Sequence, residues 1–257
     1  MDQLFDRNIL KYGRNFAASN LASGSFDKLF VESATILEET LAFLPKEIDN
    51  ILELGARVGI FTKILSSHYP SSSLEITDIS ENMLFYNNSL NKICCDEENY
   101  MHFSLEKYDL IASSLNLHWI NNLPEFLFKI RHMLNNKGCF IATLFGENTL
   151  SKTQKLLIET ESNISSSCNI RISPFIKANS LAQLLLDIGF KNVVVDLNHF
   201  EIPACKLSDL SDYLHNIGES NIMQTRYKPI FRNIYQRLKT LNIENDQYTI
   251  LNVIAKV

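Results

Sequence analysis

The stretch Ile51-Leu52-Glu53-Leu54-Gly55-Ala56-Arg57-Val58-Gly59 decides the fold class of this chain. Ile51 to Leu54 is a short apolar run typical of a buried strand, and the glycines after it permit a tight turn into a helix over 60–65. Such a turn at the carboxyl end of a parallel strand lets the backbone approach a ligand closely. The stretch predicts an α/β domain, although glycine turns of this kind also occur where no ligand binds.

The pattern on both sides of this stretch alternates between strands and helices. Such alternation predicts a mostly parallel, Rossmann-like sheet. Near the carboxyl end the order is strand, helical insertion, strand. This order suits a sheet whose last strand is antiparallel, with the insertion forming a cap. We expect residues 1–45 to form an N-terminal lid and helix, and residues 46–257 to form the main domain. The expected helices are 26–44, 60–65, 81–90, 123–134, 181–188 and 207–241, and the expected strands are 51–54, 74–77, 110–112, 138–145 (opened by an Asn-Lys-Gly turn), 193–197 and 248–257.

The composition restricts the classes of partner. The chain has 257 residues, and 24 Lys and Arg against 29 Asp and Glu give a net charge of −5, which offers no broad attraction to nucleic acid or anionic lipid. The five cysteines form no CxxC pair, so no metal site or disulfide framework is predicted. We expect reduced thiols in a cytoplasmic protein that has neither an export signal nor a membrane-spanning segment.

A carboxylate follows the second strand of the predicted sheet. Asp78 ends the run Leu74-Glu75-Ile76-Thr77-Asp78, next to the glycine turn if the two strands pair. A carboxylate at this place accepts hydrogen bonds from both hydroxyls of a cofactor ribose. Together the turn and Asp78 indicate a cofactor site, in which Glu53 is a second candidate acceptor.

Two further segments lie at predicted strand ends. Asp96-Glu97-Glu98 offers an acceptor for an adenine amino group, and a solvated acidic loop is the alternative. Ser113-Ser114-Leu115-Asn116-Leu117-His118-Trp119 follows the strand predicted over 110–112. His118 there is either a base or orienting group for a substrate, or a histidine of the core.

These motifs in series resemble class I S-adenosylmethionine methyltransferases. The runs Leu4 to Arg7, Ser113 to Pro124, Leu144 to Leu150, Ile172 to Phe175 and Gly218 to Asn221 further resemble the methyltransferase-fold assembly factors of respiratory complex I. That resemblance spans nearly the whole chain, and the biotin-pathway malonyl-carrier-protein methyltransferases are close to the same family. The family usually has glycine where this chain has Arg57, which could crowd the methionine part of the cofactor or reach its carboxylate.

The resemblance implies an S-adenosylmethionine-binding enzyme that modifies a protein side chain, for instance an arginine of the quinone-proximal subunit of complex I, either by methyl transfer or by hydroxylation. The alternatives are O-methylation of a malonyl thioester on a carrier protein, with Lys152, Lys155 and Arg171 as a basic patch, and a non-catalytic assembly chaperone. The candidate catalytic residues are His118 and Arg7, the latter on a lid segment, and no metal is expected. The candidate cofactor-binding residues are Glu53, Gly55, Ala56, Arg57, Gly59, Asp78, Ile79, Met83, Asp96, Glu97 and Ser113.

Overall fold

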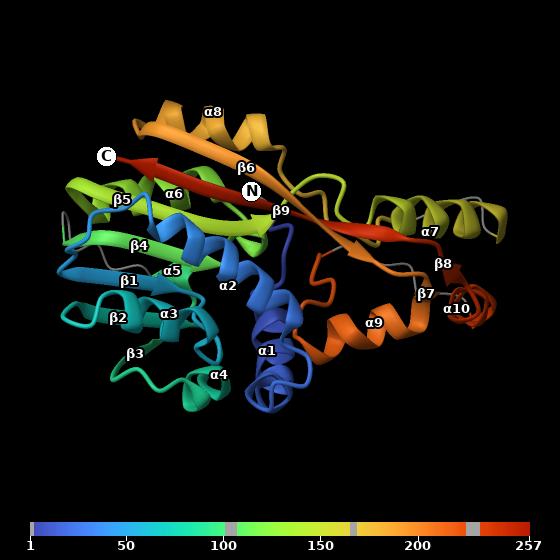
Figure 1. Ribbon diagram of the computed structural model, residues 1–257. Coiled ribbons are helices and arrows are strands. Elements are labelled where there is room, and N and C mark those ends of the chain that lie inside the picture. Colours follow the sequence, from blue (N-terminus) through green and yellow to red (C-terminus); the bar gives the residue numbers. More distant parts are fainter. Residues whose placement is uncertain (1–2, 101–106, 165–168, 225–231) are drawn as a thin grey trace.

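One seven-stranded sheet organises the protein in the computed structural model, which describes residues 3–100, 107–164, 169–224 and 232–257 (Figure 1). The strand order is β3-β2-β1-β4-β5-β9-β6. β1 to β5 are parallel, and β9 runs antiparallel to both of its neighbours, β5 and β6. The predicted Rossmann-like sheet with an antiparallel last strand is therefore confirmed. The bounds are β1 Asn50–Leu54, β2 Ser73–Asp78, β3 Asn91–Cys94, β4 Tyr108–Ser114, β5 Leu134–Phe145, β6 Lys191–Ile202 and β9 Asp246–Lys256.

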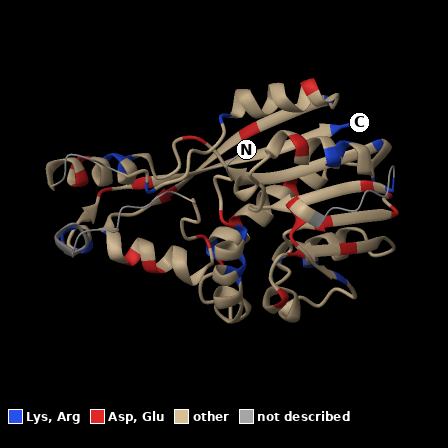
Figure 2. Cartoon of the chain, turned by 180° about the vertical axis from the view of Figure 1, so that it is seen from behind, with Lys and Arg blue, Asp and Glu red and all other residues tan. Residues whose placement is uncertain are grey.

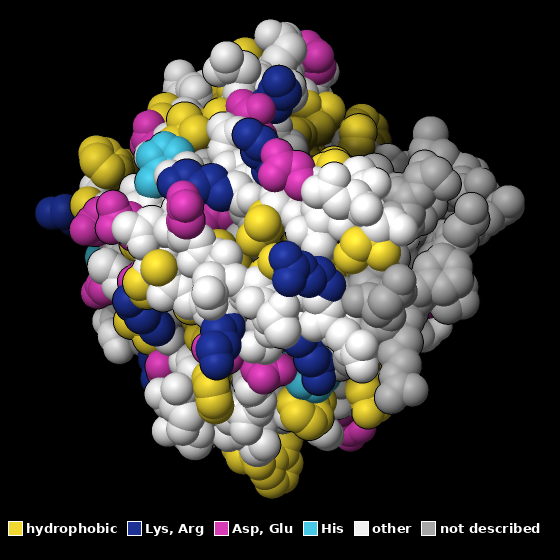
Figure 3. All heavy atoms as spheres, turned by 90° about the vertical axis from the view of Figure 1, so that its right-hand side faces the viewer, with side chains coloured by type: hydrophobic (Ala, Val, Ile, Leu, Met, Phe, Trp, Pro, Cys, Tyr) yellow, Lys and Arg dark blue, Asp and Glu magenta, His cyan; other side chains and the backbone are white. Residues whose placement is uncertain are grey.

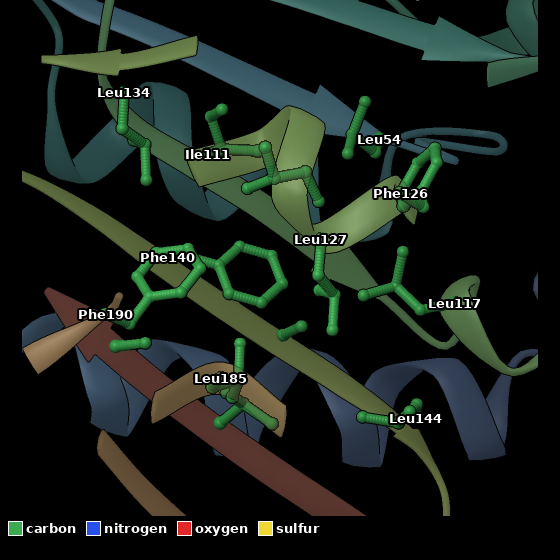
Figure 4. Packing of buried hydrophobic residues seen from close by; sticks show 14 of the residues in the cluster. Leu54, Ile111, Leu117, Phe126, Leu127, Leu134, Phe140, Leu144, Leu185 and Phe190 are labelled. Atoms are coloured by element: carbon green, nitrogen blue, oxygen red, sulfur yellow. The ribbon is translucent and has the colours of Figure 1, made fainter. Parts of the chain in front are cut away.

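Helices cover both faces of this sheet (Figure 1). α2 (Lys28–Leu41) and α3 (Ile60–His68) pack over one face, and α6 (Leu123–Met133) and α8 (Ala178–Ile188) pack over the other. On the second face, Phe126 and Leu127 of α6 and Leu185 of α8 pack against sheet residues such as Ile111 and Phe140 (Figure 4). Burial of these apolar faces against the sheet stabilises the layers.

Local sequence explains where these helices begin and end. The Asn122 side chain accepts from the Glu125 N–H at the start of α6, where a proline occupies the first turn. α8 ends at Gly189, whose φ of 100° is the left-handed conformation that glycine adopts without strain. α4 (Glu81–Tyr86) begins with the Ser80 hydroxyl accepting from the Met83 N–H.

α1 (Arg7–Ala22) lies across the carboxyl ends of the parallel strands, between α4 and α9 (Leu207–Asn216) (Figure 1). The Asp6 carboxylate accepts from the N–H groups of Asn8 and Ile9 and so caps its first turn. Phe5 forms a bridge with Met223, which joins the start of the chain to the insertion. The segment before α1 is therefore packed against the residues that follow β4 and against the insertion.

The insertion between β6 and β9 is less regular than the sequence predicts. The prediction of one continuous helix over 207–241 is wrong, because α9 stops at Asn216 before Gly218 and the described residues 217–224 are not helical; α10 is described over Arg232–Lys239. Short strands β7 (Cys205–Lys206) and β8 (Asn242–Ile243) pair at its base. α7 (Ser151–Ile164), which the sequence analysis does not predict, packs beside α10. Figure 3 shows acidic and basic side chains interspersed over the described part of this end of the molecule.

Two other predicted boundaries are wrong. The helix predicted over 81–90 ends at Tyr86, and β3 together with the short α5 (Glu97–Tyr100) follows it. The predicted Asn-Lys-Gly turn lies inside β5, where the pairing jumps from Tyr108↔Leu134 to Leu110↔Cys139 and three extra residues bulge out. The described cysteines, Cys94, Cys95, Cys139 and Cys205, are all free thiols, and Cys168 lies outside the described residues. Among the described helices, none has the length and apolarity to cross a bilayer.

Candidate functional site

Asp78 lies at the end of β2 with no exposed surface. Its Oδ2 accepts from the backbone N–H of Arg57 and from Nη1 of Arg14, both at 3.1 Å, and its Oδ1 accepts from the Ser80 N–H at 2.8 Å. The two residues in register on β1 and β2, Leu54 and Thr77, bring the glycine turn beside this carboxylate. The predicted pairing of Asp78 with the turn is therefore present.

The glycine turn has the backbone geometry that its sequence predicts. Gly55 has a φ of 67° and Gly59 a φ of 91°, which are left-handed values that a glycine tolerates. A Cβ on Gly55 would collide with the side chain of Asn116, which covers the turn. Arg57 is also left-handed, at 49°, and this conformation costs a non-glycine residue roughly 1–2 kcal/mol. Only glycine fits at Gly55, whereas Arg57 holds a glycine-like backbone under strain.

Arg14 is a site residue that the sequence analysis missed. Its side chain reaches from α1 into the cleft and is fully buried, with Nη1 on Asp78 and Nη2 2.5 Å from Oδ1 of Asn116. Arg7 of α1 pairs with Asp96 and Arg14 with Asp78, and on the ribbon basic positions of α1 lie beside acidic positions at the strand ends (Figure 2). A signal existed: Arg14 falls between Leu10 and Ala17 on the buried stripe of an amphipathic helix, where a charge needs a partner.

Two buried carboxyls flank the turn. Glu53 on β1 accepts from the Thr62 hydroxyl at 2.6 Å, and burial raises its pKa to about 8. Glu97 accepts at 3.1 Å from the Gly55 N–H and from the Thr77 hydroxyl, and burial, with the nearby charge of Asp78, raises its pKa. Both carboxyls are thus held close to Asp78, and Glu53 is neutral at pH 7.

Arg7 does not stand over the cleft as a free cation. It forms a 2.7 Å ion pair with Asp96, and Glu97 and Glu98 lie 3.5 and 3.8 Å from its guanidinium. The remaining predicted cofactor residues are buried around the same strand ends. Ile79 packs with Phe5 and Trp119, Met83 lies in the core, Ala56 donates from its N–H to Thr77, and Ser113 donates from its hydroxyl to Leu54.

His118 belongs to a buried polar network centred on Glu219, a second residue whose role the sequence left open. The Glu219 carboxylate contacts Nη2 of Arg57 at 2.5 Å, Nε2 of His118 at 3.0 Å and Nε1 of Trp119 at 2.8 Å. Burial alone would raise the pKa of Glu219, but the charge of Arg57 and the hydrogen bond from His118 lower it. Burial lowers the pKa of His118, so its ring is neutral at pH 7.

The ring of His118 therefore has a defined tautomer. Because the ionised Glu219 carboxylate only accepts, Nε2 of His118 carries the proton and Nδ1 keeps a lone pair. Nδ1 is buried and makes no hydrogen bond with the described residues. A cavity of about 180 Å³ lies against this residue, lined by aromatic side chains that include Phe5, Phe145 and Phe175.

The three basic residues considered for a carrier-protein patch are engaged with other groups. Lys152 donates to the Asn245 carbonyl, Lys155 lies 3.9 Å from Glu159, and Arg171 forms a 2.6 Å ion pair with buried Glu161. Within the described ranges, no group of three or more His, Cys, Asp or Glu side chains could hold a metal ion.

The cleft holds polar groups suited to a charged, ribose-bearing ligand. Buried atoms there without a hydrogen bond to the described residues are Arg14 Nε, Arg57 Nε and Nη1, Asn116 Nδ2 and Glu97 Oε2. Donors of this kind suit a carboxylate, and Asp78 suits ribose hydroxyls. In this conformation the side chains fill the cleft and leave only about 10 Å³ beside Gly55 and Arg57. The groups fit S-adenosylmethionine in kind, and its entry requires Arg14 and Asn116 to move.

Comparison with known proteins agrees with this geometry. Residues 27–195 match the family model described as a methyltransferase domain. The chain is 34% identical over 218 residues to RP459 of Rickettsia prowazekii, a protein named as a methyltransferase, and the match covers 82% of this chain and 94% of that protein. It is 30% identical over 227 residues to human arginine-hydroxylase NDUFAF5, covering 87% of this chain and 65% of that protein.

Solved structures share the fold at low sequence identity. YcgJ of Bacillus subtilis aligns with a TM-score of 0.60 at 10% identity over 88% of this chain and 97% of that one. A phosphoethanolamine N-methyltransferase of Haemonchus contortus, solved with S-adenosylhomocysteine, aligns with a TM-score of 0.54 at 16% identity over 86% of this chain and 52% of that one. The chain therefore belongs to the class I methyltransferase family and is an enzyme whose cofactor is S-adenosylmethionine.

Proposed function

We propose that this enzyme modifies an arginine side chain of a protein substrate, a subunit of respiratory complex I, in the cytoplasm. The runs that resemble complex I assembly factors and the similarity to arginine-hydroxylase NDUFAF5 support this acceptor. The observation that carries the proposal is the buried, neutral His118, whose Nδ1 lone pair is unused while Glu219 holds its other nitrogen.

The chemistry of the acceptor explains why such a base matters. When bound, the cofactor supplies an electrophilic methyl group on a sulfonium. A guanidinium is protonated at neutral pH and becomes a nucleophile only when it loses a proton. His118 accepts that proton at Nδ1, and Glu219 stabilises the resulting imidazolium through Nε2. Asp78 and the turn hold the cofactor, so that the protein mainly aligns the two reactants.

The aromatic cavity beside His118 suits the same acceptor. Phe5, Phe145 and Phe175 line it, and the Phe145 ring lies 4.6 Å from that of His118. Planar guanidinium groups stack on aromatic faces, and the aliphatic part of arginine packs against apolar walls. We therefore assign the cavity to the arginine side chain of the substrate.

Malonyl-carrier-protein methylation is the second candidate. A malonyl-[acyl-carrier protein] O-methyltransferase of Ilyobacter polytropus is 26% identical over 201 residues. Its acceptor, a carboxylate, is already ionised at neutral pH and needs no base. The His118–Glu219 pair therefore favours the guanidine acceptor over the malonyl group.

The test incubates the purified protein and S-adenosylmethionine with two acceptors in turn: an arginine peptide from the quinone-proximal complex I subunit, and a malonylated carrier protein. Mass spectrometry should find a CH₂ unit added to the arginine. An added oxygen atom would show hydroxylation and overturn methyl transfer, and modification of the carrier protein alone would overturn the acceptor.

Variants at two histidines test the base. His118→Asn should lower kcat roughly 10²–10⁴-fold and leave the Kd for the cofactor unchanged. His132→Asn, at an exposed position of α6, is the matched control and should have no effect. The value of kcat/KM should fall as pH drops through the lowered pKa of His118. An unchanged pH profile in His118→Asn would show that this ring is a structural histidine.

A further inference from the structure

Two arginines converge on the same carboxylate oxygen. Arg14 reaches Oδ2 of Asp78 through Nη1, and Arg57 reaches the same oxygen through its backbone N–H, each at 3.1 Å. Both side chains are buried, at 0% and 4% exposure. Burial and the nearby charge of Arg14 lower the pKa of Arg57 to about 10. Two like charges thus lie close together in a site that excludes water.

Each of these side chains has N–H donors that make no hydrogen bond with the described residues. Nη2 of Arg57 already contacts Glu219 and the Leu115 carbonyl, and its planar group lies 4.3 Å over the Phe30 ring. Its Nε and Nη1, and the Nε of Arg14, are buried without a hydrogen bond to the described residues. Buried donors in native proteins are nearly always satisfied, so an oxygen-rich anion is the group that completes this site.

Ribose binding and Arg14 compete for Asp78. When ribose hydroxyls take the Asp78 carboxylate, Arg14 loses its ion-pair partner while it remains buried. An unpaired buried cation is strongly unfavourable unless a new anion reaches it. The cofactor carries one anion, the carboxylate of its methionine part. The ribose and this carboxylate must therefore engage together.

We propose that Arg57 and Arg14 form a clamp for the carboxylate of S-adenosylmethionine, and that Arg14 exchanges Asp78 for this carboxylate when the ribose binds. The clamp makes the enzyme selective for ligands with an intact amino-acid part. It gives Arg57, which holds a left-handed φ of 49°, a role in cofactor binding in place of a steric obstruction. The proposal concerns cofactor binding alone and does not depend on the acceptor.

The test measures Kd by calorimetry for two probes, S-adenosylmethionine and its decarboxylated analogue, which keeps the adenosine, the sulfonium and the amine. The wild-type protein should prefer the carboxylate-bearing probe by roughly 10–100-fold, the range of a charge-assisted hydrogen bond. Arg57→Gly should reduce this preference about tenfold and change the Kd of the analogue by less than about twofold. Glycine suits the left-handed φ at this position, and His118 and Trp119 still contact the Glu219 carboxylate, so the variant should fold with reduced stability, which its thermal unfolding checks.

Arg14→Gln should change the affinities for the two probes in opposite directions. Because it frees Asp78 from its competitor, it should tighten binding of the decarboxylated analogue while weakening that of S-adenosylmethionine. Lys11→Gln removes an exposed charge from the same helix and is the matched control. Equal Kd values for the two probes in the wild-type protein, or an unchanged preference in Arg57→Gly, would overturn the clamp. Should Arg14→Gln fail to fold, the Arg57→Gly comparison still decides.

Discussion

Replacing Glu219 with Gln should destabilise the protein without changing its shape. The carboxylate is 5% exposed, and it is the nearest anion to the Arg57 guanidinium, at 2.5 Å. Breaking a buried pair by removing one partner costs roughly 3–5 kcal/mol, because the other charge is left uncompensated. The Leu115 carbonyl and the Phe30 ring still contact Arg57, so we expect the lower end, about 3 kcal/mol.

A second substitution isolates the cause. In the double variant Glu219→Gln/Arg57→Gly the buried cation is absent and the left-handed φ of 49° suits the residue. Most of the lost stability should therefore return, except for the contribution of the hydrogen bonds that His118 and Trp119 made to the carboxylate. Glu38→Gln, at an exposed position of α2, controls for the loss of a negative charge and should stay within about 0.5 kcal/mol of the wild type.

The assay is thermal and urea unfolding at pH 7 without ligand. For a chain of this size about 3 kcal/mol corresponds to a decrease in Tm of roughly 6–12 °C. If Glu219→Gln has the same free energy of unfolding and Tm as the Glu38→Gln control, the ion pair does not stabilise the fold. If the double variant is no more stable than the single one, an uncompensated Arg57 is not the reason for the loss.

Three further predictions concern single sites. Burial raises the pKa of Glu53 to about 8, so its contribution to stability is present below the unfolded pKa near 4.5 and is lost as pH rises through 8. The free energy of unfolding should therefore fall less from pH 6 to pH 9 in Glu53→Gln than in the wild type. An equal fall in both proteins, measured by urea unfolding, would disprove this. Gly55→Ala should cost roughly 1–2 kcal/mol for the left-handed φ alone, and more for the collision with Asn116, so a Tm within 1–2 °C of wild type would be inconsistent with the turn described. Asp246 accepts from both the N–H and the hydroxyl of Thr153 at the start of α7, and Asp246→Ala should lower stability by about 1–2 kcal/mol. Asp187→Ala, at an exposed position of α8, should not produce this loss.

The sheet could be predicted because its signals are local. Apolar runs such as Ile51–Leu54 and Leu110–Ala112 alternate with helical periods, and this alternation predicts four of the parallel strands and the antiparallel last one. It does not predict β3, whose residues Asn91–Cys94 are all exposed and form no apolar run. The start of β5 could not be predicted in the same way. Asn136 to Gly138 has the composition of a turn, but here it forms a bulge against β4, and only the pairing partner determines that outcome.

The site was predictable only in its local parts. Asp78 and the glycine turn are read from strand ends, whereas Arg14 meets Asp78 across 64 residues and Glu219 meets His118 across 101. Such contacts depend on how α1 and the insertion pack against the sheet, which no short motif specifies. The position of Arg14 between Leu10 and Ala17 on the buried stripe of α1 shows that a burial pattern can point to a charged site residue, although it does not identify the partner.

The order of strands has a consequence for the biosynthesis of the protein. β9 separates β5 from β6 although it is made after both, so a chain growing on the ribosome carries an open sheet edge on β5 until residues 246–256 have emerged. The loop that bears Glu219 lies between β6 and β9 and should adopt its final position only when β9 docks. Sheet closure and completion of the buried network around Glu219 would then be one late event, and during synthesis a chaperone that shields the β5 edge would protect the nascent chain from aggregation.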